Sequence, residues 1–159
     1  MSLPKSASVV IVGGGVSGCA IAWNLAKEGV RDVVVLEKDT LGNGSTGRCG
    51  AGVRMQWGAK RNCQLALFSI EFFEKANEIL EYERDIEFDQ SGYLIVAANE
   101  KEAQQFKKNV ALQNSLGIDS KYLTPGEARE IVPHIDTSQF VAATFCHRDG
   151  HLNPFHTTE

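Results

Sequence analysis

The sequence predicts an α/β fold that begins with a strand–helix–strand unit, and three observations support this prediction. Residues 8–12 read Ser-Val-Val-Ile-Val, a short β-branched run typical of a strand buried on both faces. Residues 16–27 carry apolar side chains at helical spacing, and Gly29 follows where a helix-ending glycine is common. Residues 33–36 form a second apolar run. Strand, helix and strand in about 30 residues predict a βαβ unit with parallel strands.

Beyond this unit the sequence predicts a long loop, three helices and two strands. In chain order these are a loop over 39–60, a helix over 61–82, a strand over 93–98, a helix over 100–116, a short helix over 125–132 and a strand over 140–146. Asn99 is the expected N-cap of the second helix, and Thr124-Pro125-Gly126-Glu127 predicts a capping box with proline at the first helical position. Asn153-Pro154 looks like one more helix start close to the end, so we expect the sequence to be truncated.

These elements together predict a Rossmann-like, three-layer dinucleotide-binding domain followed by the start of a second, mostly antiparallel β domain. We expect residues 1–84 to form the dinucleotide-binding portion and residues 85–148 to begin the substrate domain. Residues 149–159 would return to the first domain.

Composition limits the possible partners. The net charge of −4 argues against a nucleic-acid partner, which would need a basic surface. No apolar run is long enough for a membrane span, and no secretory leader is visible, so we expect a cytoplasmic protein. The four cysteines are far apart in sequence and form no Cys-x-x-Cys pair, so we expect free thiols. The segment between His147 and His151 holds a turn-forming Asp-Gly instead of a helix, so we predict no metal site there.

The glycine-rich stretch after the first strand carries the functional prediction. Gly13, Gly15 and Gly18 satisfy the pattern G-x-G-x-x-G directly between a predicted strand and a predicted helix. Gly13 permits the tight turn, Gly15 lets a pyrophosphate approach the main chain, and Gly18 lets helix and strand pack closely. The amides of Val16 and Ser17 would then face the phosphates at the positive end of the helix dipole. The alternative is a glycine-rich turn that binds nothing.

Glu37 supports the binding interpretation because it ends the second strand 19 residues after Gly18. An acid at this position accepts hydrogen bonds from the adenosine ribose and disfavours a 2′-phosphate, which argues against NADP. The alternative for Glu37 is a solvated surface acid.

The fingerprint alone leaves FAD and NAD open, since both contain ADP. Residues 42–54 follow the second strand with many small residues instead of a further helix–strand repeat. Small residues let the main chain approach a flat ring, and Ser45 and Thr46 offer hydroxyls to phosphate or ribitol. A mobile surface loop is the alternative.

On these motifs the chain resembles the D-amino-acid-oxidase-like FAD oxidoreductases, the glycine/sarcosine oxidase group. The matching stretches are Val-Val-Ile-Val-Gly-Gly-Gly-Val-Ser-Gly, Val-Leu-Glu-Lys, Gly-Ser-Thr-Gly-Arg-Cys-Gly-Ala-Gly-Val-Arg, Gln-Ser-Gly-Tyr-Leu, Leu-Thr-Pro-Gly-Glu-Ala and Asp-Gly-His-Leu-Asn-Pro. The likeness is strongest to the β subunits of heteromeric sarcosine oxidases and to dye-linked L-proline dehydrogenases. Members of the group are well over twice as long as this chain.

The resemblance implies FAD as cofactor and places it on named residues. The expected contacts are Gly13, Gly15, Val16, Ser17, Gly18, Glu37 and Lys38 for the adenosine and diphosphate, and Gly44, Ser45, Thr46, Arg48 and Gly52 along the pyrophosphate, ribitol and flavin. Arg54 aligns with an active-site arginine near the flavin in monomeric sarcosine oxidases, where an arginine can fork onto a substrate carboxylate. On the sequence alone, Arg54 is equally compatible with a surface cation.

The expected function is FAD-dependent oxidation of a small secondary amine or amino acid, of the sarcosine, glycine or proline class, to an imine. Two alternatives stay open at this stage. The chain could hold FAD for electron transfer to partner subunits of a heteromeric dehydrogenase, or it could be a non-catalytic truncated fragment.

Overall fold

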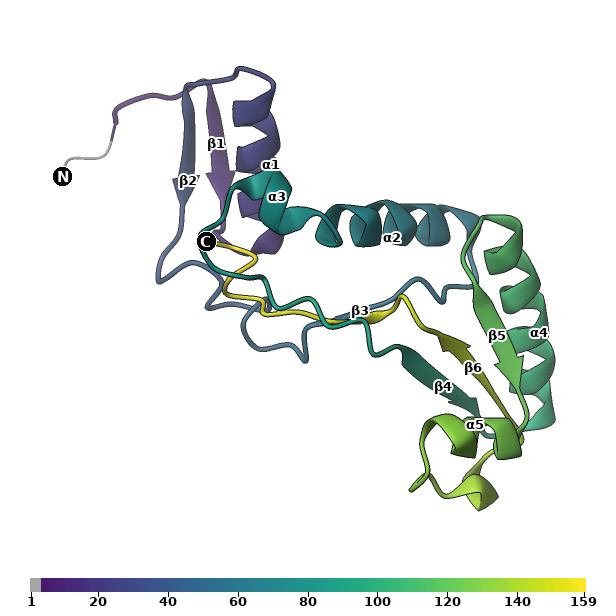
Figure 1. Cartoon of the computed structure of the whole chain (residues 1–159). Coiled ribbons are helices and arrows are strands. Elements are labelled where there is room, and N and C mark those ends of the chain that lie inside the picture. Colours follow the sequence, from purple (N-terminus) through teal and green to yellow (C-terminus); the bar gives the residue numbers. More distant parts are fainter. Residues whose placement is uncertain (1–3) are drawn as a thin grey trace. The chain divides into compact units, whose positions relative to one another are not determined.

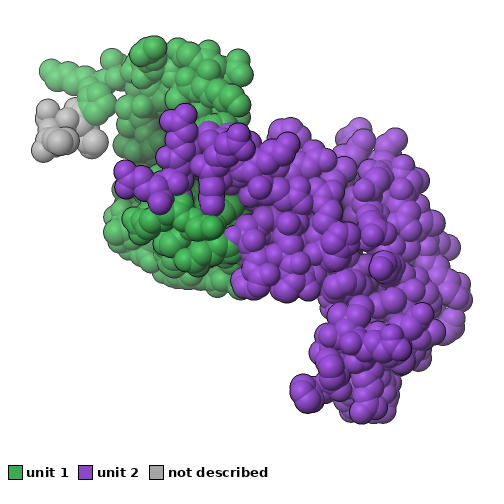
Figure 2. Space-filling view, in the orientation of Figure 1, with its two compact units in different colours: residues 1–51, 84–87, 152–159 green, residues 52–83, 88–151 purple. Residues whose placement is uncertain are grey.

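In the computed structural model, which describes residues 4–159, contacts divide the chain into two units, coloured separately in Figure 2. Of the described residues, the first unit comprises 4–51, 84–87 and 152–159, and the second comprises 52–83 and 88–151. The second unit thus includes residues 52–83, which the sequence analysis assigned to the dinucleotide-binding portion. The two units are defined by packing and not by cofactor binding. The assignment of residues 1–84 and 149–159 to the dinucleotide-binding domain and of residues 85–148 to the substrate domain therefore stays a prediction.

The first unit contains the predicted βαβ arrangement. Strands β1 (Val9–Val12) and β2 (Val33–Leu36) pair in parallel, with Val9 opposite Val33, and helix α1 (Val16–Lys27) connects them (Figure 1). Helix α1 ends as expected before Gly29, whose φ of +85° lies in the left-handed region that glycine adopts without strain. The strand–helix–strand prediction is therefore confirmed.

The two faces of this small sheet differ in burial. Ile11 is buried, whereas Val10 is 51% and Val12 is 84% exposed. Because side chains alternate along a strand, Val10 and Val12 share the face opposite to Ile11. The expectation that the first strand is buried on both faces was wrong for the described chain, since the first unit supplies one helix and that helix covers one face.

The second unit is built on an antiparallel sheet in the order β4-β6-β5, from Tyr93–Ala97, Ala142–Cys146 and Ser120–Leu123 (Figure 1). Helix α4 (Glu100–Ser115) and helix α5 (Pro125–Ile131) pack against it. Successive residues of β6 point to opposite faces of the sheet and pack into two clusters: Ala142 packs with Ala97 and Ala103, and Ala143 packs with Leu123, Ala128 and Phe140. A mostly antiparallel second region was expected, although the sequence analysis missed β5.

Both predicted caps in this unit form. The Asn99 side chain accepts a hydrogen bond from the Glu102 amide at 3.1 Å. Thr124 accepts from the Glu127 amide at 3.3 Å, and the Glu127 carboxylate accepts from the Thr124 amide at 2.7 Å. This reciprocal pair is the capping box that the sequence predicted at the start of α5.

The helix expected over 61–82 is broken, which corrects that prediction. Helix α2 (Lys60–Phe73) and helix α3 (Ala76–Leu80) are separated at Lys75, whose ψ of 7° is not helical. The Glu74 carboxylate at the break forms two hydrogen bonds with the Arg148 guanidinium, at 2.8 and 2.9 Å, and accepts a third from Gln90. These partners lie far along the chain, so helical spacing alone did not reveal the interruption.

Three smaller features complete the fold. The short strand β3 (Gly52–Val53), which lies inside the predicted long loop, pairs in antiparallel fashion with β7 (Gly150–His151), and a 3-10 helix spans Thr137–Gln139. Residues 154–158 form hydrogen-bonded turns rather than the expected helix, although the Asn153 side chain accepts from the Phe155 amide as an N-cap does. Within residues 4–159 no helix has both the length and the apolar character needed to cross a membrane.

Candidate functional site

The glycine-rich turn brings the main chains of β1 and α1 together. Gly13 has a φ of +107°, and its amide donates to the Leu36 carbonyl at 2.8 Å, one residue beyond the paired strand. A Cβ on Gly18 would overlap the Gly13 carbonyl oxygen and lie 3.1 Å from the carbonyl carbon. The turn and the helix therefore pack main chain against main chain, which is the role that the sequence analysis gave to the first and third glycines.

The start of α1 carries the polarity that an anion requires. Its N-cap residue is Gly15, which provides no capping side chain, and its first turn holds no acidic residue. Unpaired amides at a helix start carry partial positive charge, and the helix dipole adds about 0.3–1 kcal/mol for a nearby anion. The Val16 amide donates to the Thr46 hydroxyl at 3.1 Å, so a residue of the predicted cofactor loop lies against this helix start.

Glu37 turns back toward the glycine-rich turn. One carboxylate oxygen accepts from the Gly14 amide at 2.8 Å, and the other accepts from the Asp39 amide at 3.1 Å. The hydrogen bond from Gly14, helped by that from Asp39 and by the charge of Lys38, holds the pKa of Glu37 below its usual value. An ionised carboxylate has about four lone-pair positions, so each oxygen keeps capacity for a ribose hydroxyl.

The loop after β2 is tied to the turn through main-chain bonds. The Gly42 amide donates to the Gly14 carbonyl at 2.8 Å, and the Gly47 amide donates to the Gly42 carbonyl at 2.7 Å. The Cys49 thiol donates to the Thr46 carbonyl at 2.9 Å. These bonds fix the loop that carries Thr46, while Gly44, Ser45, Arg48 and Lys38 are exposed.

The segment 152–159 supports the same loop, and sequence reasoning missed this. A Cβ on Gly47 would lie 2.6 Å from the Phe155 ring, and a Cβ on Gly42 would lie 3.0 Å from the Thr158 hydroxyl. Thr158 is 3% exposed. The unexplained glycines of the loop were the available signal, because a glycine that lacks a turn role often marks a close contact.

The structure brings together one subset of the expected site residues. Gly13, Gly15, Val16, Gly18, Glu37 and Thr46 meet around the turn, with Ser17 in the first turn of α1. Gly52 and Arg54 belong to the second unit. There, a Cβ on Gly52 would overlap the Tyr93 hydroxyl, so the absence of a side chain at this position admits a tyrosine ring.

The Arg54 side chain is exposed to solvent and lies over the Trp57 ring. Its guanidinium carbon lies 4.8 Å from the centre of the Trp57 ring, and the Trp57 indole nitrogen donates to the Arg54 carbonyl at 3.0 Å. A guanidinium above an aromatic face is held by cation–π attraction. The arrangement leaves the planar fork of Arg54 available for a carboxylate.

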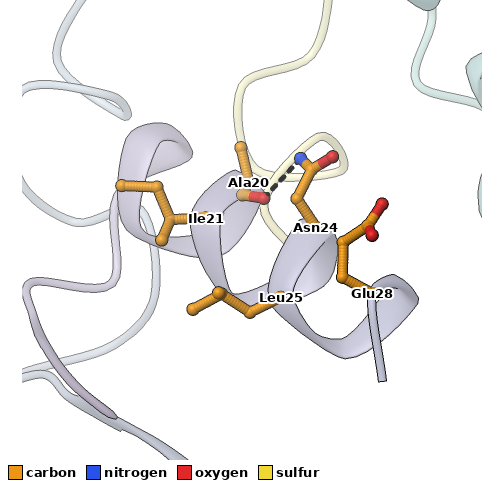
Figure 3. A pocket seen from close by; sticks show the side chains of 5 residues that line it. All are labelled: Ala20, Ile21, Asn24, Leu25 and Glu28. Atoms are coloured by element: carbon orange, nitrogen blue, oxygen red, sulfur yellow. Dashed lines mark hydrogen bonds between the residues drawn. The ribbon is translucent and has the colours of Figure 1, made fainter. Parts of the chain in front are cut away.

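A shallow hollow on α1 is a poor alternative site. It is lined by Ala20, Ile21, Asn24, Leu25 and Glu28, which lie along one side of the helix (Figure 3). The Asn24 amide nitrogen donates to the Ala20 carbonyl at 2.8 Å, so that side chain is occupied within its own helix. Ligand sites combine apolar walls with convergent polar groups, and this open helix surface lacks that combination.

Comparison with known proteins identifies the family of the chain. The family described as "FAD dependent oxidoreductase" matches residues 8–159. The chain is 36% identical to FAD-dependent oxidoreductase domain-containing protein 1 of Xenopus laevis, covering 96% of this chain and 32% of that protein.

Two solved structures share the fold. The L-proline dehydrogenase of P. horikoshii is 40% identical with a TM-score of 0.87, covering 98% of this chain and 40% of its own. The glycine oxidase of Geobacillus kaustophilus is 29% identical with a TM-score of 0.82, and the match covers 96% of this chain and 42% of the glycine oxidase. The chain thus spans between 32% and 42% of the length of these three relatives. The α/β fold and the resemblance inferred from the sequence are confirmed, and FAD is the cofactor of this family.

Proposed function

Because the chain belongs to the FAD dependent oxidoreductase family, we propose that it provides the ADP-binding part of a flavoenzyme that oxidises a small amino acid or secondary amine. The observation that carries the proposal is the side-chain-free cradle formed by Gly13, Gly15 and Gly18, with the Glu37 carboxylate bonded to the Gly14 amide across it. A diphosphate fits such a cradle because its oxygens accept from main-chain amides that no Cβ obstructs.

Each part of the cradle has one task toward the nucleotide. The Ser17 amide would donate to the diphosphate directly, and Glu37 would accept from the ribose hydroxyls. The Val16 amide donates to the Thr46 hydroxyl, so Val16 would act on the diphosphate through that hydroxyl, which can donate its own proton to a phosphate oxygen. Lys38 is proposed to lie beside the adenosine and diphosphate, and the exposed residues Gly44, Ser45 and Arg48 are proposed to lie along the diphosphate and ribitol.

In the second unit, Gly52 and Arg54 are proposed for the reacting end. Arg54 would bind the substrate carboxylate through two parallel hydrogen bonds, which fixes the orientation of the amino acid. Bound FAD supplies the acceptor for the hydride that leaves the carbon beside the amine nitrogen, which yields an imine that water hydrolyses. We propose proline, glycine and sarcosine as the substrate class, because the first two are named in the two structural relatives and the third is expected from the sequence.

The test is the visible absorption of the purified, FAD-loaded protein under anaerobic conditions. Bleaching of the flavin band by sarcosine, glycine or L-proline supports the proposed oxidation. Bleaching that requires an added partner subunit favours the electron-transfer alternative, and failure to retain any FAD contradicts the proposal. Partner subunits and a cytoplasmic location, both expected from the sequence, stay predictions.

A further inference from the structure

A buried carboxylate in the second unit lies directly behind the segment that carries Arg54. Asp149, between β6 and β7, is 0% exposed. One of its oxygens accepts from the Met55 amide at 2.7 Å, and the other accepts from the Gln56 side-chain nitrogen at 3.0 Å. The Cys146 thiol is a further hydrogen-bond partner of Asp149. Removing a carboxylate from water is costly unless the group is hydrogen-bonded, and these bonds offset that cost.

The environment of Asp149 acts on its protonation in two directions. Burial raises the pKa of Asp149 above its ordinary value, whereas the hydrogen bonds from Gln56, Met55 and the Cys146 thiol and, least of all, the positive charge of Arg54 oppose that rise.

Other buried groups hold the following residues of the segment in place. The Gln56 nitrogen that binds Asp149 also donates to the Tyr93 carbonyl at 2.8 Å. The Trp57 carbonyl accepts from the Gln113 side chain at 2.9 Å and from the Cys63 thiol at 3.2 Å. The main chain from Met55 to Trp57 is thus fixed on its buried side.

The orientation of Gln56 depends on Asp149. Its side-chain nitrogen donates to two acceptors, while its oxygen is buried without a hydrogen-bond partner. Reversing the amide would direct the oxygen at both the carboxylate and the Tyr93 carbonyl, so only one orientation keeps both bonds. Asp149 therefore determines how Gln56, two residues after Arg54, is held.

We infer that Asp149 is a positioning residue, which acts through Met55 and Gln56 to hold Arg54 where it receives the carboxylate of an amino-acid substrate. The inference rests on the proposed function for the role of Arg54. Two of the hydrogen bonds of Asp149 end on the two residues that follow Arg54, and the guanidinium itself stays exposed over Trp57. Groups that orient a ligand-binding residue from behind affect binding even though they do not touch the ligand.

The direct test is Asp149→Asn in the FAD-loaded protein. Asparagine keeps the shape and can still accept from Met55, but its amide nitrogen faces the nitrogen of Gln56, so Gln56 must turn and lose the Tyr93 carbonyl. We expect KM for the amino acid to rise about tenfold, as for other indirect supports, with a smaller change in kcat and unchanged FAD occupancy. Asp136→Asn is the matched control, because the Asp136 carboxylate binds Ser138 and Gln139 instead, and wild-type KM is expected.

A second variant keeps the inference testable if Asp149→Asn does not fold. Gln56→Met retains length and burial but removes the donor to Asp149, and it is expected to raise KM in the same direction. A KM within twofold of wild type in whichever of these variants are folded and FAD-loaded overturns the inference.

Fluorescence separates this inference from the proposed function. Trp57 is the single remaining tryptophan in a Trp23→Phe background. In that background Asp149→Asn is expected to increase quenching of Trp57 emission by acrylamide, because the segment 54–57 loosens. A wild-type protein that holds FAD but oxidises no amino acid contradicts the proposed function. Independently of that result, unchanged acrylamide quenching of Trp57 in the Asp149→Asn variant overturns the positioning role.

Discussion

Replacing Gly18 by alanine places a methyl group against the main chain of the glycine-rich turn. The new Cβ would overlap the Gly13 carbonyl oxygen, lie 3.1 Å from its carbonyl carbon and lie 3.4 Å from the Ile11 side chain. A main-chain carbonyl cannot rotate away as a flexible side chain does, so α1 has to move away from β1. Overpacking of this kind costs about 1–3 kcal/mol.

The same displacement should weaken FAD binding, because it moves the Ser17 amide away from the diphosphate. A loss of about 1.4 kcal/mol corresponds to a tenfold rise in Kd, so we expect at least that change in a flavin titration. Urea unfolding followed by circular dichroism measures the stability change in parallel.

Gly126→Ala is the matched control for this substitution. Gly126 lies in α5, its φ is not in the left-handed region, and the nearest atom to an added Cβ is the Thr124 hydroxyl at 3.9 Å. Alanine is favoured over glycine inside a helix by about 0.5–1 kcal/mol, so this variant should be slightly more stable and bind FAD normally. A Gly18→Ala protein with the stability and Kd of wild type would refute the close packing of turn and helix.

Three further predictions follow from single contacts. Arg54→Ala should leave FAD bound but slow flavin reduction by an amino acid in stopped-flow measurements, and normal reduction kinetics would return Arg54 to the role of a surface cation. Glu37→Gln should lower the free energy of unfolding at neutral pH. Because the pKa of Glu37 is lowered on folding, the difference in unfolding free energy from wild type should be complete above the usual glutamate pKa and disappear as the pH falls through the lowered value. A difference in urea unfolding that does not depend on pH would contradict this. Thr124→Ala should lower the free energy of unfolding by about 1 kcal/mol through loss of the capping box, and an unchanged urea midpoint would show that the cap is not stabilising.

The local elements were predictable because their signals are local. The β-branched runs at 9–12 and 33–36 and the caps at Asn99 and Thr124 depend on residues within a few positions of each other. The glycine-rich turn was predictable for the same reason, since its spacing and its position after a strand are visible in about ten residues.

The contacts between distant segments were not predictable from these signals. Helix α2 ends where Glu74 meets Arg148, and the loop around Gly47 is supported by Phe155, more than a hundred residues later. Asp149 appeared in the sequence only as part of a family-like stretch, although it is the buried acceptor for Met55 and Gln56. Such partners are selected by the three-dimensional packing, which a periodic pattern does not specify.

The position of the FAD diphosphate is the property on which the proposed function depends most. A crystal structure of the FAD-loaded protein is expected to show the diphosphate against the Ser17 amide and the Thr46 hydroxyl, with a Glu37 carboxylate oxygen within hydrogen-bonding distance of the ribose. A structure in which the diphosphate lies elsewhere, or in which the Glu37 carboxylate points away from the ribose, would contradict this placement.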